Sequence, residues 1–228
     1  MDIDAKDKDN LTPLHIASEA GNISVVKELL KHNPNLDITD KVGQTALRFA
    51  SGEGHTLVVK ELLKFRGKFQ KLNDWSLHIA AINGHIDVVR ALLEHGVEVD
   101  PLDQDTENET PLHDAAEKGY AHIVKELLNH GANINARTNR GDTVIHKLLY
   151  CTTTPQYDSR LENEYLAALE VLLDKKYGID LTLKCKLGFT PIETAIKLGE
   201  HKMARMIAKF LCPQPKITDS IYPLKHFL

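Results

Sequence analysis

The sequence predicts an all-α fold, a solenoid of stacked helix pairs joined by tight turns. Three recurring features predict it: an apolar hexapeptide, a Thr-Pro-Leu-His signature and a glycine between the two. The hexapeptide Val25–Leu30 returns unchanged as Val58–Leu63, and near copies stand at Val88–Leu93 and Ile123–Leu128. One helix pair cannot cover its own apolar face, so the units are expected to stack into a continuous core.

The first helix of each unit is predicted from the signature that begins at Thr12. A threonine hydroxyl caps a helix well, and Pro13 suits the first helical position because its missing N–H costs nothing there. A glycine such as Gly21 then ends the short helix in a left-handed turn. The signature begins at Thr12, Thr45, Trp75, Thr110, Thr143 and Thr190, in steps of 33, 30, 35, 33 and 47 residues.

The second helix of each unit is predicted from the hexapeptide. Val26, Leu29 and Leu30 form an apolar stripe, while Lys27 and Glu28 fall on the opposite side. A tight turn precedes the next signature, marked by Gly43, Gly141 and Gly188 two positions before the threonine. Asn10 and Asn108 stand at the same position, and asparagine is the next-best residue for a left-handed turn.

These motifs resemble the ankyrin-repeat family. The 33-residue step, the Thr-Pro-Leu-His signature, Gly54-His55 and Gly84-His85 after the first helix, and the segment Gly131–Ala136 all fit its pattern. The resemblance covers about residues 4–211. It implies a right-handed solenoid of antiparallel helix pairs with short β-hairpin loops that project to one side. The inner helices and hairpins of such proteins line a concave face that typically binds other proteins.

The predicted domain is an ankyrin-repeat array over residues 1–211, followed by a C-terminal tail at 212–228. Its six repeats are expected at about 4–37, 38–70, 71–100, 101–135, 136–181 and 182–211. An insertion is predicted near 151–160, where three threonines and a proline are poor helix formers.

Two departures from the repeat leave alternatives open. Trp75 replaces the capping threonine beside a hairpin shortened by about three residues, and it either fills the resulting void or forms an exposed binding hot spot. The loop from Val97 to Glu109 is acidic and contains no Lys or Arg, so it is either a negative finger for a basic partner or a solvated loop tip. Arg137 and Arg140 give the next hairpin the opposite sign.

Composition and charge exclude several classes of protein. The 228 residues carry a net charge of −4, which argues against a protein that coats nucleic acid or anionic membrane. No apolar run is long enough to span a bilayer, and the acidic N-terminus does not look like a secretory signal. Three widely spaced cysteines rule out a disulfide framework as the organising feature. The expected location is cytoplasmic, or the cytosol of a host cell if the protein is a secreted effector.

The twelve histidines are expected to be structural, because nine of them occupy recurring positions. A catalytic base is needed once, whereas a residue present in every unit serves the unit. In proteins that this chain resembles, the signature histidine bonds backbone between neighbouring units. We therefore expect no metal, no cofactor and no enzymatic activity.

The predicted function is protein–protein interaction, as an adaptor, scaffold or inhibitor that binds through the concave face. The partner is expected to be a protein or peptide, with a basic segment as one option, and the chain is expected to be a monomer that binds neither nucleic acid nor membrane. Carried from the family's pattern, the candidate binding residues are Lys8, Asp9, Leu11, Lys41, Val42, Gln44, Glu53, Asp74, Trp75, Ile82, Asn83, Leu102, Asp105, Glu107, Glu109, Glu117, Lys118, Arg137, Arg140, Asp142 and Tyr150. Two alternatives stay open: a regulatory fragment of a larger enzyme or channel, and a microbial effector that targets host proteins.

Overall fold

A computed structural model describes residues 2–66, 75–102, 107–151 and 162–212. In these ranges the chain forms twelve α-helices and no strand, which confirms the all-α solenoid. The first helices of the pairs are α1 (Pro13–Glu19), α3 (Ala46–Gly52), α5 (Ser76–Ile82), α7 (Pro111–Glu117), α9 (Val144–Cys151) and α11 (Pro191–Leu198). The second helices are α2 (Ile23–Leu30), α4 (Thr56–Arg66), α6 (Ile86–Glu94), α8 (Ala121–Asn129), α10 (Glu162–Leu172) and α12 (His201–Leu211), and a short 3-10 helix, η2 (Lys175–Tyr177), follows α10.

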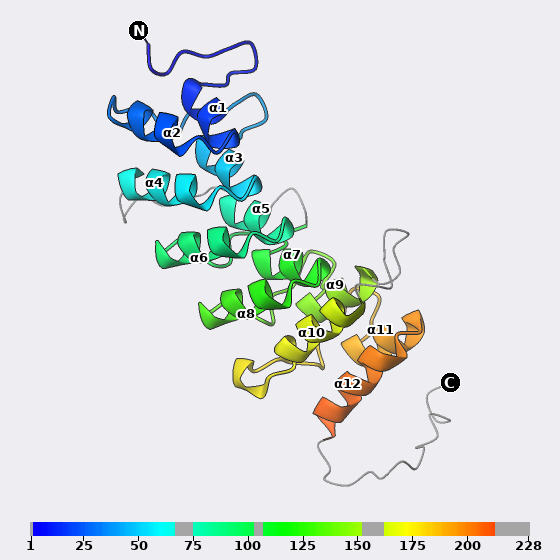
Figure 1. Cartoon of the computed structure of the whole chain (residues 1–228). Coiled ribbons are helices and arrows are strands. Elements are labelled where there is room, and N and C mark those ends of the chain that lie inside the picture. Colours follow the sequence, from blue (N-terminus) through cyan, green and yellow to red (C-terminus); the bar gives the residue numbers. More distant parts are fainter. Residues whose placement is uncertain (1, 67–74, 103–106, 152–161, 213–228) are drawn as a thin grey trace.

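The helices stack as six consecutive pairs in two rows (Figure 1). The first helices pack on one another as the inner row, and the second helices pack side by side as the outer row. We number the pairs 1 to 6 and call the loop before each inner helix a finger, numbered by the pair that it precedes. The predicted repeat boundaries stay predictions, and most of the predicted insertion and of the C-terminal tail lies outside the described residues.

The core runs continuously through both rows. The inner helices of pairs 1 to 5 bury an apolar residue at the third signature position, such as Leu14, Leu47 or Leu112, and Ile192 of pair 6 is partly buried. The outer helices contribute the predicted stripe, of which Val26 and Leu30 are buried. Burial of one such side chain contributes about 2 kcal/mol relative to leaving it exposed, so the stability is spread along the stack.

The capping threonines form the hydrogen bonds that the sequence predicts. In pair 1 the His15 backbone N–H donates to the Thr12 hydroxyl at 3.5 Å, and the Thr12 N–H donates to Nδ1 of His15 at 3.1 Å. The same reciprocal arrangement starts α7 with Thr110 and His113. In α11 the acceptor side chain is Glu193, which receives the Thr190 N–H at 2.7 Å.

In pairs 1 and 5 the signature histidine also joins its pair to the next finger. Because Nδ1 of His15 accepts a backbone N–H, the proton of the neutral ring is on Nε2, which donates to the carbonyls of Ile38 and Gln44 at 3.1 and 3.2 Å. His146 reaches Phe189 O at 3.1 Å in the same way. The inter-unit role expected for this histidine is therefore present at both joints.

The joint between pairs 2 and 3 is built differently. Arg48 stands where pairs 1, 3, 4 and 5 have histidine, and Trp75 stands where the other pairs have the capping threonine. The Arg48 guanidinium lies over the Trp75 ring at 5.0 Å, a cation–π contact. Trp75 is half-buried and makes no side-chain cap, so this geometry favours the void-filling interpretation, while its role in binding stays a prediction.

The glycines that end the inner helices fit against a ring of the following pair. Gly54 has a φ of +75°, and a Cβ added to it would lie 2.7 Å from the His85 ring. That ring is held in place because Nε2 of His85 donates to the Gly52 carbonyl at 2.9 Å. Gly84 meets Tyr120 in the same manner. Glycine is thus needed for its left-handed backbone and for the close approach.

The fingers are tight turns closed by backbone hydrogen bonds between their first and last residues. The amide of the first finger residue donates to the carbonyl four residues later at 3.0 Å in four fingers: Asp7 to Leu11, Asp40 to Gln44, Thr138 to Asp142, and Cys185 to Phe189. The residue before the last has positive φ in each case, as predicted for Asn10, Gly43, Gly141 and Gly188.

Two glycine substitutions separate backbone strain from packing. Gly96→Ala should cost about 1 kcal/mol of unfolding free energy, because Gly96 has a φ of +86° but nothing lies within 4 Å of the added Cβ. Gly54→Ala should cost roughly 3 kcal/mol, because strain and the clash with His85 add. Denaturant unfolding measures both values, and equal losses would contradict the stacked-ring interpretation.

The buried histidines predict a loss of stability in acid. Burial lowers the pKa of His113 to about 4 from 6.5, so between these pH values the unfolded chain binds a proton that the folded chain does not. Stability is therefore complete above pH 6.5 and falls as the pH drops toward 4. Urea unfolding across this range should show a shallower fall for His113→Gln than for the wild type.

Exposed His32 provides the control, since His32→Gln should leave the wild-type slope unchanged. Burial raises the pKa values of Glu109 and Asp114, and these carboxyl groups oppose the trend equally in all three proteins. Identical slopes for wild type and His113→Gln would show that His113 does not contribute.

Candidate functional site

Most of the predicted binding residues lie on fingers and on the inner helices. On the fingers, Lys8, Asp9, Lys41, Val42, Leu102, Arg137 and Arg140 are exposed, whereas Leu11, Gln44, Glu107 and Glu109 are half-buried and Asp142 is buried. On or beside the inner helices, Glu53 and Asn83 are exposed, while Trp75, Ile82, Glu117, Lys118 and Tyr150 are half-buried. Asp74 and Asp105 lie outside the described residues.

Neighbouring fingers are joined by backbone hydrogen bonds in a fixed register. The second residue of one finger donates its N–H to the carbonyl of the third residue of the finger before it. Lys41 donates to Asp9 at 3.1 Å, Asn139 to Glu107 at 2.7 Å, and Lys186 to Arg140 at 2.8 Å. The third residues therefore form a row of tips that includes Asp9, Val42, Glu107, Arg140 and Leu187.

A cleft opens where fingers 4 to 6 meet the inner helix α9. It encloses about 780 Å³ and is lined by Glu107, Glu109, Arg140, Asp142, Lys147, Tyr150, Lys186 and Leu187. Five of these eight residues are among the sequence-predicted site residues. The structure thus brings five predicted residues of pairs 4 and 5 together, whereas the predicted residues of fingers 1 and 2, and Leu102, Glu117, Lys118 and Arg137, do not line this cleft.

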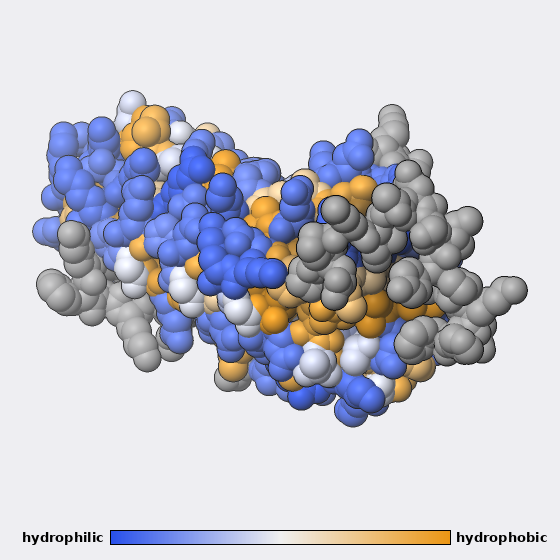
Figure 2. All heavy atoms as spheres, turned by 90° about the horizontal axis from the view of Figure 1, so that it is seen from below, coloured by the Kyte–Doolittle hydropathy of each residue, from blue (hydrophilic) through white to orange (hydrophobic). Residues whose placement is uncertain are grey.

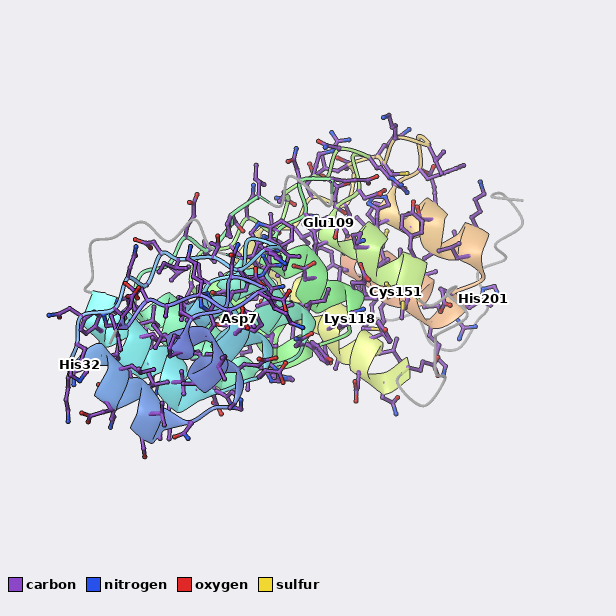
Figure 3. The ribbon with its side chains drawn as sticks, turned by 90° about the horizontal axis from the view of Figure 1, so that it is seen from above. Asp7, His32, Glu109, Lys118, Cys151 and His201 are labelled. Atoms are coloured by element: carbon purple, nitrogen blue, oxygen red, sulfur yellow. The ribbon has the colours of Figure 1, made fainter. Side chains whose placement is uncertain are left out.

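A half-buried ion cluster forms the floor of the cleft. Nζ of Lys147 lies 2.8 Å from Glu109 and 2.7 Å from Glu117, so one ammonium group of α9 binds two carboxylates of pair 4. Figure 3 shows Glu109 at one end of α7 and Lys118 at the other. Because the cluster joins adjacent inner helices, it fixes the finger and the helix walls relative to each other.

The pKa values in this cluster follow from burial and from Lys147. Burial acts to lower the pKa of Lys147, but its hydrogen bonds to Glu109 and Glu117 outweigh burial and raise it, so the amine stays protonated. Burial raises the pKa of Glu109 despite its bond to Lys147. At the more exposed Glu117, burial acts to raise the pKa, but the hydrogen bonds and charges of Lys147 and Lys118 together outweigh burial and lower it.

The residue one position after the signature histidine (after Arg48 in pair 2) contacts the preceding pair at several joints. In pair 2 the Phe49 ring packs edge-on against His15 at 5.8 Å. In pair 4 the Asp114 carboxylate lies 2.6 Å from Nδ1 of His78, whose Nε2 faces the Pro101 carbonyl at 2.9 Å. Lys147 occupies the equivalent position in pair 5, and its ion cluster is the contact that this position makes with the preceding pair.

Two carboxylates of the acidic finger are paired with cations within the chain. Glu107 pairs with Arg140 of the next finger at 2.7 Å, and Glu109 is bound by Lys147. Asp100 accepts the Asn133 N–H at 2.8 Å, a bond from a neutral donor. Glu107 and Glu109 therefore offer less negative charge to a basic partner than the sequence suggests, whereas Glu98 is exposed.

Three lining residues were not predicted: Lys147, Lys186 and Leu187. Lys186 and Leu187 occupy the same finger positions as Lys41 and Val42, which were predicted, so the repeat register contained the signal that finds them. The Leu187 side chain is 72% exposed, as is that of Val42. Lys147 had no such signal, because its partners Glu109 and Glu117 belong to the preceding pair.

The site carries no sign of nucleophilic or metal chemistry in the described ranges. Burial raises the pKa of the Cys151 thiol to about 12, so the thiol is protonated at neutral pH. No three His, Cys, Asp or Glu side chains converge as metal ligands within the part of the chain that the structure describes. None of the described helices is long and apolar enough to cross a lipid bilayer.

The comparisons with known proteins agree with this architecture. The family model for ankyrin repeats in three copies matches residues 1–74 and 67–138, so the chain belongs to the ankyrin-repeat family. No curated protein sequence matches the chain.

Two solved structures illustrate the likeness. The ankyrin-repeat domain of Bcl-3, described as a unique member of the IkappaB family, superposes with a TM-score of 0.75 at 25% identity, over 91% of this chain and 86% of that one. An ankyrin-repeat domain from Acinetobacter baumannii AYE gives 0.73 at 24% identity, over 87% and 97%. The protein is a protein-interaction module in general terms, and members of this family are typically non-enzymatic.

The ion cluster predicts a specific pattern of stability. Lys147→Ala should cost about 2 kcal/mol of unfolding free energy, because two half-buried carboxylates lose their common cation. Adding Glu109→Gln and Glu117→Gln should restore at least half of that loss, since amides carry no charge to leave unpaired. Denaturant unfolding of the single and triple variants measures this, and an equal or greater loss in the triple variant would contradict the proposed coupling.

Proposed function

We propose that this chain binds a partner protein through its concave face, with the cleft between fingers 4 to 6 and α9 as the principal contact. The observation that carries the proposal is the cleft itself, whose volume of about 780 Å³ suits one or two large side chains. Leu187 and Tyr150 give it apolar surface beside charged groups, the combination expected of an anchor pocket with a polar rim.

The electrostatics of the cleft support a rigid site of this kind. Glu107, Arg140, Glu109 and Lys147 hold one another in ion pairs, so the walls are ordered before any partner arrives. A preorganised site loses less conformational entropy on binding than one that must order itself.

The distribution of hydropathy is uneven on the surface. Figure 2 shows that hydrophobic residues gather toward the middle and right of the face seen from below, while hydrophilic residues cover much of the remainder.

In the cell such binding makes the protein an adaptor, a scaffold or an inhibitor. A regulatory part of a larger enzyme or channel and a microbial effector acting on host proteins would use the same surface. The cytoplasm, or a host cytosol, is the setting that fits these roles. Identification of the partner decides among them.

A matched pair of leucine substitutions tests the proposal. Leu187 in the cleft is 72% exposed, and Leu57 on the outer helix α4 is 69% exposed. Leu187→Asp should reduce recovery of bound proteins from a lysate by about tenfold, because a charge replaces an apolar anchor. Leu57→Asp should leave recovery unchanged, and both variants should keep the wild-type thermal midpoint. Equal recovery with the wild type and both variants would refute binding at this cleft.

A further inference from the structure

Lys186 in finger 6 lacks the acidic neighbour that the equivalent lysine of finger 2 has. The backbone of Lys41 donates to the Asp9 carbonyl, and its ammonium pairs with the Asp9 carboxylate at 3.4 Å. The backbone of Lys186 makes the same bond, but the tip that it meets is Arg140. The shared register therefore places Lys186 of finger 6 next to the cationic residue Arg140 of finger 5. At the equivalent position, Lys41 of finger 2 is next to the acidic residue Asp9 of finger 1.

Arg137 and Lys184 form a second contact between like-charged residues of the same two fingers. Nη2 of Arg137 donates to the backbone carbonyl of Lys184 at 2.7 Å, and its Nε donates to the Gly141 carbonyl at 3.3 Å. The guanidinium is thereby held by neutral acceptors that leave its charge uncompensated. We call Arg137, Arg140, Lys184 and Lys186 the basic rungs.

Within the described residues, Arg140 is the member of these four that forms an ion pair, while the charge of Lys184 adds to the larger effect of the Thr190 hydrogen bonds in lowering the pKa of Glu193. Glu107 pairs with Arg140. Glu193 has its carboxylate bound by the Thr190 amide and hydroxyl at 2.7 and 2.9 Å, and Asp142 is buried. In the described ranges no carboxylate forms an ion pair with Arg137, Lys184 or Lys186, all three of which are exposed. A positive surface thus remains on a chain of net charge −4.

We infer that the basic rungs bind an acidic segment of the protein partner, whose aspartate or glutamate carboxylates take the place that Asp9 has beside Lys41. This inference rests on the proposed function, because the rungs border the cleft through Arg140 and Lys186. The acidic residues would flank the apolar side chain that enters the cleft beside Leu187.

The surrounding charges favour an acidic peptide over a nucleic acid. Glu107, Glu109 and Asp142 line the same cleft as the rungs, so a long polyanion that continued past finger 5 would meet carboxylates. The overall charge of −4 also repels a long phosphate backbone. A short acidic stretch needs only the two fingers, and its carboxylates match the ammonium and guanidinium donors.

Fluorescence anisotropy with a labelled peptide tests the inference on the whole chain. The probe is a short glutamate-rich peptide with one central leucine, compared with a peptide in which lysine replaces glutamate. The glutamate peptide should bind, should weaken as salt is raised because surface charges are screened, and should exceed the lysine peptide in affinity by at least about tenfold. No salt-sensitive binding, or tighter binding of the lysine peptide, would overturn the inference.

Charge reversal then locates the site. The variant Lys184→Glu with Lys186→Glu should lose at least about tenfold in affinity for the glutamate peptide. The control Lys60→Glu with Lys125→Glu makes the same net charge change at exposed positions of the outer helices α4 and α8 and should bind as the wild type does. Equal weakening in both variants would mean that only net charge matters, and the inference would fall.

Two further outcomes separate this inference from the proposed function. If a single-stranded oligonucleotide of equal charge bound more tightly than the peptide and competed for the rungs, the acidic-protein assignment would be wrong. If recovery of a lysate partner depended on Leu187 but was unaffected by the Lys184 and Lys186 reversals, the proposed function would stand and the inference would fail. Loss of recovery in both sets of variants supports both.

Discussion

The hydrogen bonds of the signature histidine connect the helix cap, the core and the finger of the next pair. In pair 1 the ring accepts the N–H that starts its own helix and donates to the carbonyls of the next finger. The same buried ring therefore caps the start of its own helix, fixes its own protonation state and positions the following finger. Because the fingers carry the recognition surface, the geometry of that surface depends on an interaction made in the core.

Where the histidine pattern changes, the residues on both sides of a joint change together. Arg48 and Trp75 replace histidine and threonine at one joint and contact each other directly. Asp114 of pair 4 binds His78, which belongs to pair 3, the pair that begins with Trp75. Lys147 joins two carboxylates of the preceding pair. Each joint thus has its own set of matching residues. A residue that departs from the repeat pattern in one pair is explained by its contact with a residue of the adjacent pair.

This coupling explains which features the sequence could predict. Helix order, caps and left-handed turns depend on residues within a few positions of one another, so Thr12, Pro13 and Gly21 were sufficient to predict them. The floor of the cleft depends on residues from different units, since Lys147 lies about one repeat beyond Glu117 and further from Glu109. No local sequence pattern predicts that Lys147 contacts Glu109 and Glu117.

The charge of the recognition surface was hard to predict for the same reason. Read along the chain, the loop before Thr110 is acidic and the next finger is basic. In space, Arg140 pairs with Glu107 and Lys147 pairs with Glu109, so part of the charge of the acidic finger is compensated, and Lys184 and Lys186 add positive charge beside Arg137 and Arg140. Lys186 and Leu187, by contrast, could have been found by carrying the Lys41 and Val42 positions into the last finger.

The bonds between fingers have a consequence for how this surface can vary. Lys41 to Asp9, Asn139 to Glu107 and Lys186 to Arg140 are all bonds between backbone atoms, so they persist whatever side chains the tips carry. Amino-acid replacement at a tip can therefore alter binding specificity without disturbing the link that positions the tip. Selection can act on each finger separately, and a new partner can be acquired one finger at a time while the stack itself is inherited unchanged.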